Sequence, residues 1–264
     1  MIRSKSRLPG SRAAVLFSAI LTASCEDVHA SPRGAAAPVQ RASAVTAAPA
    51  RPTGAELLRG IALERASLLK TFQSARTDAA RVLVRKKAIR YLERTLIDDV
   101  LPRWNGTPWS FSGTSTTPGQ GSIACGYFVS TTLEEAGLRV ERARLAQQAS
   151  EDIIKSLVPP GAITRYSDVP VEKFTAAVAA RGDGLYVVGL DNHVGFLVVK
   201  GGEVLFHHAS YVDTVKVVRE EAALASPLAG SRYRVVGKLF TDDALIDAWI
   251  LGSPVATKIR TKTR

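Results

Sequence analysis

The stretch Gly121-Ser122-Ile123-Ala124-Cys125-Gly126-Tyr127-Phe128-Val129-Ser130-Thr131-Thr132-Leu133-Glu134-Glu135-Ala136-Gly137 predicts a loop that runs directly into a helix. Small residues precede Cys125, apolar residues then recur at helical spacing, and Gly137 supplies a C-terminal stop. Cys125 is therefore expected in the first turn of the helix, where unpaired N–H groups and the helix dipole favour a thiolate. This position suits a nucleophile. The alternative interpretation is a small buried residue that only fills space.

The N-terminus carries the pattern of an export signal. Four basic residues precede the apolar run of residues 13–23, which predicts a secretory signal peptide over residues 1–30. Val28-His29-Ala30 resembles a signal-peptidase site. Thr22-Ala23-Ser24-Cys25 instead resembles a lipobox without its usual leucine, in which Cys25 would be lipidated, and we favour this second interpretation. Both predict an exported protein, either periplasmic or anchored as a lipoprotein.

Cysteine and histidine are sparse in the rest of the chain. Once the leader is removed or Cys25 is lipidated, Cys125 is the one free thiol of an exported protein, which marks it as a candidate reactive residue. Apart from His29, the histidines are His193, His207 and His208. The formal net charge of +11 favours polyanionic surroundings such as cell wall or anionic lipid. Nothing resembles a base-reading module, so no nucleic-acid partner is expected.

Composition divides the chain into regions. Residues 31–54 are rich in alanine, proline and arginine and predict a disordered tether. Residues 55–104 predict two helices with apolar faces. Basic residues on the second helix form either a wall- or lipid-binding face or an ordinary solvated exterior. Residues 105–124 are rich in glycine, serine and threonine and predict a loop, residues 105–252 form the expected catalytic domain, and residues 253–264 a basic tail.

The secondary-structure pattern changes near Gly182. Before it, helices are predicted over about 141–157 and from an N-cap at Asp168 to about residue 180. After it, the short apolar runs 185–190, 194–199 and 204–206 predict an antiparallel meander, with a hairpin turn at Gly201-Gly202. Further strands are predicted over 215–218 and 233–240, and a closing helix over 242–251. Helices followed by strands indicate an α+β fold, with the helices packed on a small antiparallel sheet.

Three histidines fall at the ends of the predicted strands. His193 opens the second strand, whereas His207 and His208 close the third. Adjacent strand residues point to opposite faces, so only one of the latter two shares a face with His193, at a strand spacing of about 4.8 Å. Cys125 as nucleophile, His193 as base and a third polar group as orienting residue would form a catalytic triad. The residues lack the spacing of metal-ligand pairs, so neither a metal nor another cofactor is expected.

These residues also carry a family resemblance. Asn192-His193-Val194-Gly195-Phe196, followed by Phe206-His207-His208-Ala209-Ser210, resembles the His-Val-Gly and His-Ala-Ser motifs of NlpC-type cell-wall cysteine peptidases, in the papain-like superfamily. Cys125-Gly126-Tyr127-Phe128-Val129 resembles the Cys-Ser-Gly-Phe-Val motif of that family. Pro108-Trp109-Ser110-Phe111-Ser112-Gly113-Thr114-Ser115 resembles its Pro-Tyr-x-x-Gly-Gly-Thr-Ser. The motifs occur in the family's order and cover most of residues 107–211.

The resemblance implies a papain-like fold and assigns roles to individual residues. Cys125 becomes the nucleophile, His193 the base and His208 the orienting group, with His207, Asn192 and Asp191 as alternatives for that last role. Trp109 falls where the family has a tyrosine that helps to hold the oxyanion. Ala124 replaces an aspartate of the family, which leaves the substrate open.

The expected function is that of an exported cysteine peptidase or amidase acting in the cell envelope. Its expected substrate is a peptidoglycan stem peptide, cleaved through an acyl-enzyme, and its expected membrane tether is a lipidated Cys25. Two alternatives are a papain-like acyltransferase or amidase with another substrate, and a non-catalytic envelope-binding lipoprotein with a degenerate site.

Overall fold

The computed structural model describes residues 52–258. The predicted leader, Cys25, nearly all of the predicted tether and the end of the basic tail lie outside the described residues. Within residues 52–258, no helix combines the length and the hydrophobicity needed to cross a lipid bilayer.

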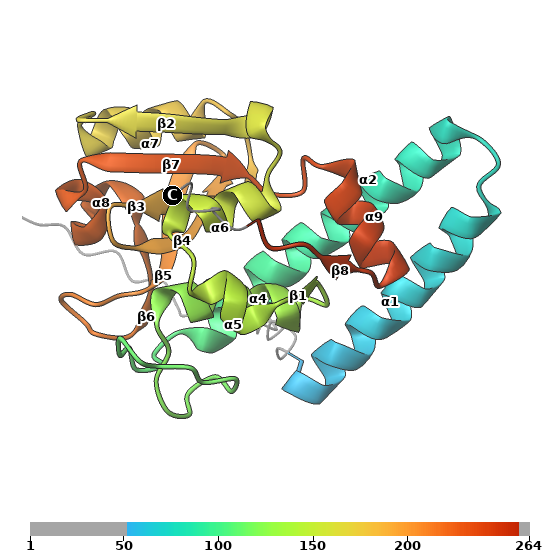
Figure 1. The fold of residues 1–264 in the computed structure, drawn as a ribbon, viewed down its shortest axis with the longest axis horizontal. Helices are drawn as coiled ribbons and strands as arrows, with labels where there is room; N and C mark the ends of the chain where they lie inside the picture. The colour runs from blue at the N-terminus through green and yellow to red at the C-terminus, as the bar shows by residue number, and fades with distance from the viewer. Residues whose placement is uncertain (1–51, 259–264) are drawn as a thin grey trace, which may run out of the picture. The chain divides into compact units, whose positions relative to one another are not determined.

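Two long helices begin the described chain, as the sequence predicts. Helix α1 (Gly54–Ser74) starts with a capping box, in which Thr53 accepts a hydrogen bond from the Glu56 amide and the Glu56 carboxylate accepts one from the Thr53 amide. Helix α2 (Asp78–Arg94) continues through the π-helical segment η1 (Thr95–Val100) into α3 (Leu101–Trp104). Both long helices pack against α9 (Asp243–Leu251), as Figure 1 shows.

Helix α4 (Cys125–Glu135) is the central helix, and most of its residues are buried. The single helix predicted over 141–157 is wrong, because the chain forms α5 (Arg142–Ala146) and α6 (Ser150–Leu157) with a break between them. Packing explains the break: α5 lies against α4, where Gly126 leaves room for the Ala146 carbonyl, whereas α6 turns to pack on strands β3 (Gly184–Leu190) and β7 (Tyr233–Lys238). Helical periodicity alone does not reveal this change of partner.

The sheet has six antiparallel strands in the order β2-β7-β3-β4-β5-β6. The predicted meander is present, and Gly201 and Gly202 form its hairpin turn with φ of +59° and +87°. The strands are β2 (Ile163–Ser167), β3 (Gly184–Leu190), β4 (Val194–Lys200), β5 (Glu203–Ala209), β6 (Val217–Glu221) and β7 (Tyr233–Lys238).

Two further segments differ from the prediction. Strand β2 was not predicted, and Asp168 after it does not cap a helix: it has a φ of +54°, and its carboxylate accepts a hydrogen bond from Arg232. Helix α7 (Val171–Ala179) begins after Pro170 instead. The predicted tail also begins with structure, because β8 (Pro254–Val255) pairs in parallel with β1 (Arg139–Val140).

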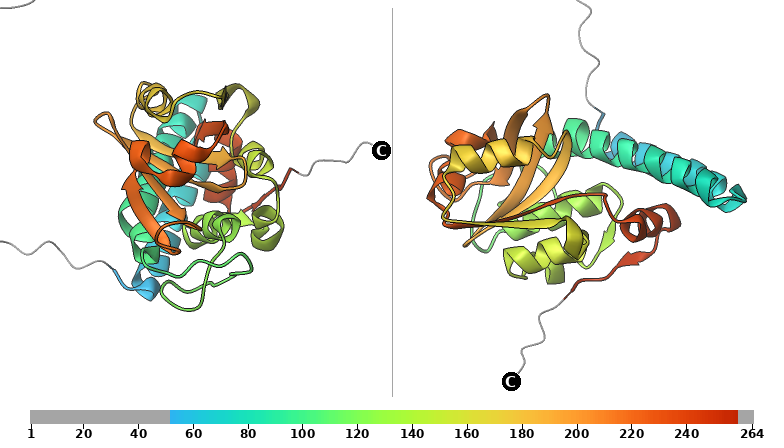
Figure 2. Two further views of the ribbon diagram at one scale, coloured as in Figure 1. Left: turned by 90° about the vertical axis from the view of Figure 1, so that its left-hand side faces the viewer. Right: turned by 90° about the horizontal axis from the view of Figure 1, so that it is seen from above.

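Helices cover both faces of the sheet, which gives the α+β architecture that the sequence predicts (Figure 2). Alternate residues along β3 separate the two cores. Leu185 and Val187 join the core formed with α1, α2, α4, α6 and α9. Tyr186 and Val188 join a second core with α7 and α8 (Ser226–Gly230). The first core fixes α4 against β4 and β5; His193 directly precedes β4, and His207 and His208 lie in β5.

Candidate active site

Cys125 is the first residue of α4, as predicted. Ala124, the N-cap residue, is extended and offers no side-chain cap, so the first-turn amides of α4 are not capped by a side chain. The backbone amides of Val194, Gly126 and Cys125 lie near the thiol sulfur, where each acts to lower the thiol pKa. Val194 directly follows His193, so the helix tip and the start of β4 meet at the sulfur.

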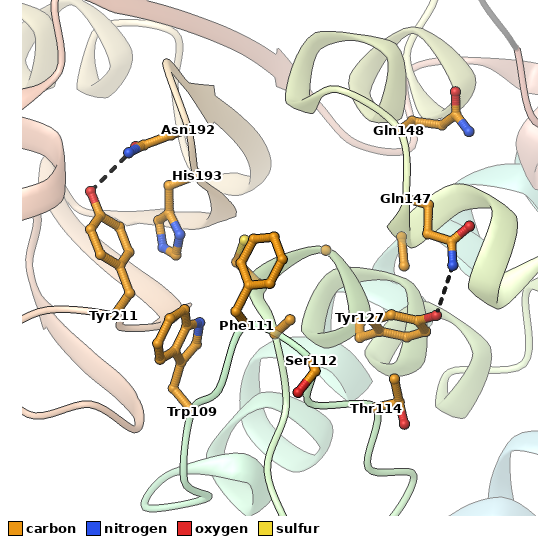
Figure 3. Close-up of a pocket in the computed structure, with 14 residues that line it drawn as sticks. Trp109, Phe111, Ser112, Thr114, Tyr127, Gln147, Gln148, Asn192, His193 and Tyr211 are labelled. Atoms are coloured by element: carbon orange, nitrogen blue, oxygen red, sulfur yellow. Dashed lines mark hydrogen bonds between the residues drawn. The ribbon is translucent and has the colours of Figure 1, made fainter.

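His193 occupies the tight connection between β3 and β4, where its carbonyl accepts a hydrogen bond from the Leu190 amide at 2.8 Å. Its side chain is buried with 1% exposure, yet it borders a cleft of about 780 Å³ that Cys125 also lines (Figure 3). Cys125 and His193 also contribute to the wall of a second, smaller cleft of about 230 Å³. The predicted nucleophile and base therefore share one site, at the junction of two clefts.

A chain of hydrogen-bonded side chains extends from His193 into the sheet. Its Nε2 lies 2.9 Å from Nδ1 of His208, and Nε2 of His208 lies 2.8 Å from Oε1 of Glu220. His207 points away from this pair, as strand alternation requires. The other proposed orienting residues have different partners: Asp191 accepts hydrogen bonds from Ser231 and from the amides of residues 232 and 233, and Asn192 from the Tyr211 hydroxyl.

Gly195 allows this chain to form. A Cβ atom at this position would lie 2.7 Å from the Phe206 ring and 2.9 Å from Cβ of His208. Without it, the His208 ring stacks on Phe206 with 4.0 Å between centroids, and the His193 ring stands nearly perpendicular to both, at 83° and 85°. The glycine of the His-Val-Gly motif is therefore required by packing beneath the imidazoles.

Glu220 determines which nitrogen of each ring carries hydrogen. An ionised carboxylate only accepts hydrogen bonds, so it selects the His208 tautomer with hydrogen on Nε2. Nδ1 of His208 must then accept from Nε2–H of His193, which leaves Nδ1 of His193 with a free lone pair. This Nδ1 is buried and has no hydrogen-bond partner among the described residues. Nδ1 of His193 is therefore the atom able to accept a proton.

Burial keeps both members of the candidate dyad uncharged. It lowers the pKa of His193 to about 3, and it raises the pKa of the Cys125 thiol. The amides of Val194, Gly126 and Cys125 lower the thiol pKa, but burial is the larger effect. The thiolate that the helix tip leads one to expect is thus not the resting form, because sequence position does not reveal desolvation. The site suits proton transfer during attack rather than a preformed ion pair.

Trp109 places an unused donor at the same cleft. Its backbone amide donates to the Val215 carbonyl at 3.0 Å, which anchors the loop that follows α3. Its indole Nε1 is buried and has no hydrogen-bond partner among the described residues. Figure 3 shows this nitrogen on the side of the ring that faces Phe111 and the cleft. The position therefore offers an N–H for an acceptor brought by a ligand.

The sequence did not identify Glu220. Its signal is the register of β5 and β6, in which Phe206 pairs with Glu220 and His208 pairs with Val218, so that His208 and Glu220 lie on one face. The predicted strand over 215–218 ended before Glu220. Among residues 52–258, no group of three or more histidine, cysteine, aspartate or glutamate side chains is arranged to hold a metal ion.

Comparison with known proteins identifies no family: no protein-family model and no curated protein sequence matches the chain.

The buried histidines make a testable prediction about acid stability. Burial lowers the pKa of His193 and His207 to about 3 and also lowers that of His208, from an ordinary value of 6.5. Below pH 6.5 the unfolded chain binds protons that the folded chain excludes, so stability falls as the pH is lowered toward 3, by up to about 1.4 kcal/mol per pH unit for each group. We expect Tm to decrease between pH 7 and pH 4. The decrease in Tm should be smaller in His207→Phe than in the wild-type protein. An equal decrease in both would contradict the assignment of the effect to the buried histidines.

Proposed function

We propose that this protein is an exported thiol hydrolase that cleaves an amide bond in the cell envelope through an acyl-enzyme on Cys125. One observation carries the proposal: a hydrogen-bonded chain from Glu220 through His208 to His193 leaves a bare imidazole nitrogen at the cleft that contains the only thiol among residues 52–258. A nucleophile, a base and an orienting group in this order are the parts that covalent acyl transfer requires.

In the proposed mechanism, Nδ1 of His193 takes the thiol proton as the sulfur attacks the scissile carbonyl. The backbone amide of Cys125 and Nε1 of Trp109 donate to the oxyanion that forms. The carbon–nitrogen bond then breaks, and the leaving amine takes the proton from Nδ1, so that a thioester remains. Water attacks the thioester with His193 again as base, which releases a carboxylic acid and restores the thiol.

The proposed substrate is a peptidoglycan stem peptide. The support for it is the order of the motifs that resemble those of NlpC-type peptidases, together with the predicted export signal and the basic character of the chain. A lipidated Cys25 would hold the enzyme at the membrane. The experiment that tests this substrate is digestion of purified peptidoglycan, followed by mass spectrometry of the soluble fragments. New carboxyl and amino termini within the stem peptide support it, and intact stems after prolonged incubation overturn it.

The resting state predicts how the thiol reacts with iodoacetamide. Because burial raises the Cys125 pKa, the alkylation rate should increase steadily with pH from 6 to 9. Removing the base in His193→Ala should slow alkylation at pH 7, where the thiol depends on proton transfer. A rate that is already maximal in mild acid would instead reveal a preformed thiolate–imidazolium pair, and a rate independent of His193 would count against the proposed function.

A further inference from the structure

The wide cleft beside Cys125 is lined without charge. Fourteen residues form its wall, and none is aspartate, glutamate, lysine or arginine; its one histidine, His193, is kept neutral by burial. The chain as a whole carries a net charge of +11, so this absence is local. A charged group that entered the cleft would lose part of its hydration and gain no countercharge, which is unfavourable.

Aromatic rings dominate this wall instead. They belong to Trp109, Phe111, Tyr127 and Tyr211. Phe111 is 90% exposed, more than any other large hydrophobic side chain among residues 52–258. In Figure 3 its ring lies between His193 and Tyr127, over the middle of the cleft. Binding of an apolar group over the exposed Phe111 ring would be favourable, because it removes apolar surface from water.

Arg142 and Asp191, two charged residues beside the wide cleft, are engaged elsewhere. Arg142 stacks on Tyr127, with 4.9 Å to the ring centroid, but its guanidinium donates to the Thr131 hydroxyl and to the carbonyls of residues 114 and 115. Asp191 lines the small cleft and not the wide one, and Oδ2 of its carboxylate accepts several hydrogen bonds. The two clefts beside the sulfur therefore differ in chemistry, because only the small one has a carboxylate on its wall.

Neutral polar groups complete the wide cleft. Gln147, Gln148 and Asn192 line it, and each has an amide that both donates and accepts hydrogen bonds. Figure 3 shows Gln147 bonded to the Tyr127 hydroxyl and Asn192 to that of Tyr211, whereas the Gln148 amide donates to the Arg144 carbonyl. Such groups fit the uncharged amides of a peptide and offer no ion pair to a carboxylate or an ammonium group.

We propose that the wide cleft selects substrates whose part on one side of the scissile bond is uncharged and apolar, with an aliphatic or aromatic side chain that packs between Phe111 and Tyr127. This inference rests on the proposed function and narrows it. Among amide bonds in envelope peptides, the enzyme cleaves those in which the part bound in the wide cleft has no free carboxylate or ammonium group. The small cleft, with Asp191 on its wall, holds the other side of the bond.

The test uses the full-length enzyme and internally quenched peptides in two series. One series varies the residue on the acyl side of the scissile bond, and the other varies the residue on the amine side, each among leucine, phenylalanine, alanine, glutamate and lysine. We expect one series to show kcat/KM about 100-fold higher for leucine or phenylalanine than for glutamate or lysine. An amide of octanoic acid, cleaved as well as the leucine peptide, would identify an acyl chain rather than a side chain as the apolar group.

Phe111 supplies the matched variant. Phe111→Ala should raise KM for the leucine peptide about tenfold with kcat little changed, so that the ratio of kcat/KM between the leucine and alanine peptides falls by about the same factor. Leu224→Ala is the control, because Leu224 is also highly exposed, at 74%, but does not line the cleft.

The outcomes separate this inference from the proposed function. Equal cleavage of charged and apolar peptides in both series, or an unchanged selectivity in Phe111→Ala, overturns the substrate inference and leaves the thiol mechanism standing. No turnover of any peptide, combined with alkylation that does not depend on His193, overturns the proposed function and this inference with it.

Discussion

Replacing Cys125 with alanine is expected to lower kcat by about 10⁴-fold or more on every substrate that the wild-type protein cleaves. In the proposed mechanism each productive event passes through a thioester on this sulfur, and removal of a nucleophile from a catalytic triad has an effect of this size. The measurement is release of new termini from purified peptidoglycan, or of fluorescence from the quenched peptides. Retained turnover in Cys125→Ala would rule out covalent catalysis at this site.

A stability control makes this result interpretable. The change removes one sulfur atom at the tip of α4, where the side chain is only partly buried, and leaves the core residues Phe128 and Leu133 of the same helix in place. We therefore expect a Tm close to that of the wild-type protein. Cys125→Ser, which keeps a weak nucleophile of similar size, should also be inactive, because a hydroxyl is far harder to deprotonate than a thiol.

Replacing Glu220 with glutamine is expected to lower kcat by about 100-fold or more with little change in KM. A glutamine can donate a hydrogen bond from its amide to Nε2 of His208, which moves hydrogen to Nδ1 of that ring. His193 must then accept at Nε2 and carry its own hydrogen on Nδ1, which removes the Nδ1 lone pair that the proposed mechanism uses as the base. Losing the correct tautomer of a catalytic histidine costs up to about 10⁴-fold in the serine-protease triad.

The neighbouring residue supplies the control for Glu220. Glu221 is the next residue of β6 and is exposed, so Glu221→Gln makes the same chemical change away from the histidine chain. We expect wild-type kcat in Glu221→Gln and matching Tm values for both variants. Activity in Glu220→Gln equal to that of the wild-type protein would show that the carboxylate does not set the tautomer. A large fall in Tm in that variant alone would indicate a structural role instead.

Much of the fold was predictable because its signals are local. The helix that starts at Cys125, the long N-terminal helices and the Gly201-Gly202 hairpin follow from periodicity, small residues and turn chemistry. The break between α5 and α6 and the strand β2 were not predictable in this way. Both are set by partners that lie far along the chain: Ser150 hydrogen-bonds to Leu190, and β2 pairs with β7.

The candidate site was likewise predictable only where its signals are local in the sequence. Alternation within a strand is enough to predict that only one of His207 and His208 faces His193, and the structure places His208 there. Glu220 could not be found without the register of β6, which the sequence does not specify. The charge state of Cys125 depends on how much protein surrounds the sulfur, and the position of the residue at a helix tip suggests the opposite answer.

The location of Cys125 and His193 on the walls of both clefts bears on the order of events in a catalytic cycle. If each cleft holds one side of the scissile bond, as proposed, the first product can leave one cleft while the second half of the substrate stays covalently attached in the other. The vacated cleft then gives solvent a path to the thioester. A competing amine could use the same path, so the ratio of water to amine in this cleft would decide between hydrolysis and transpeptidation.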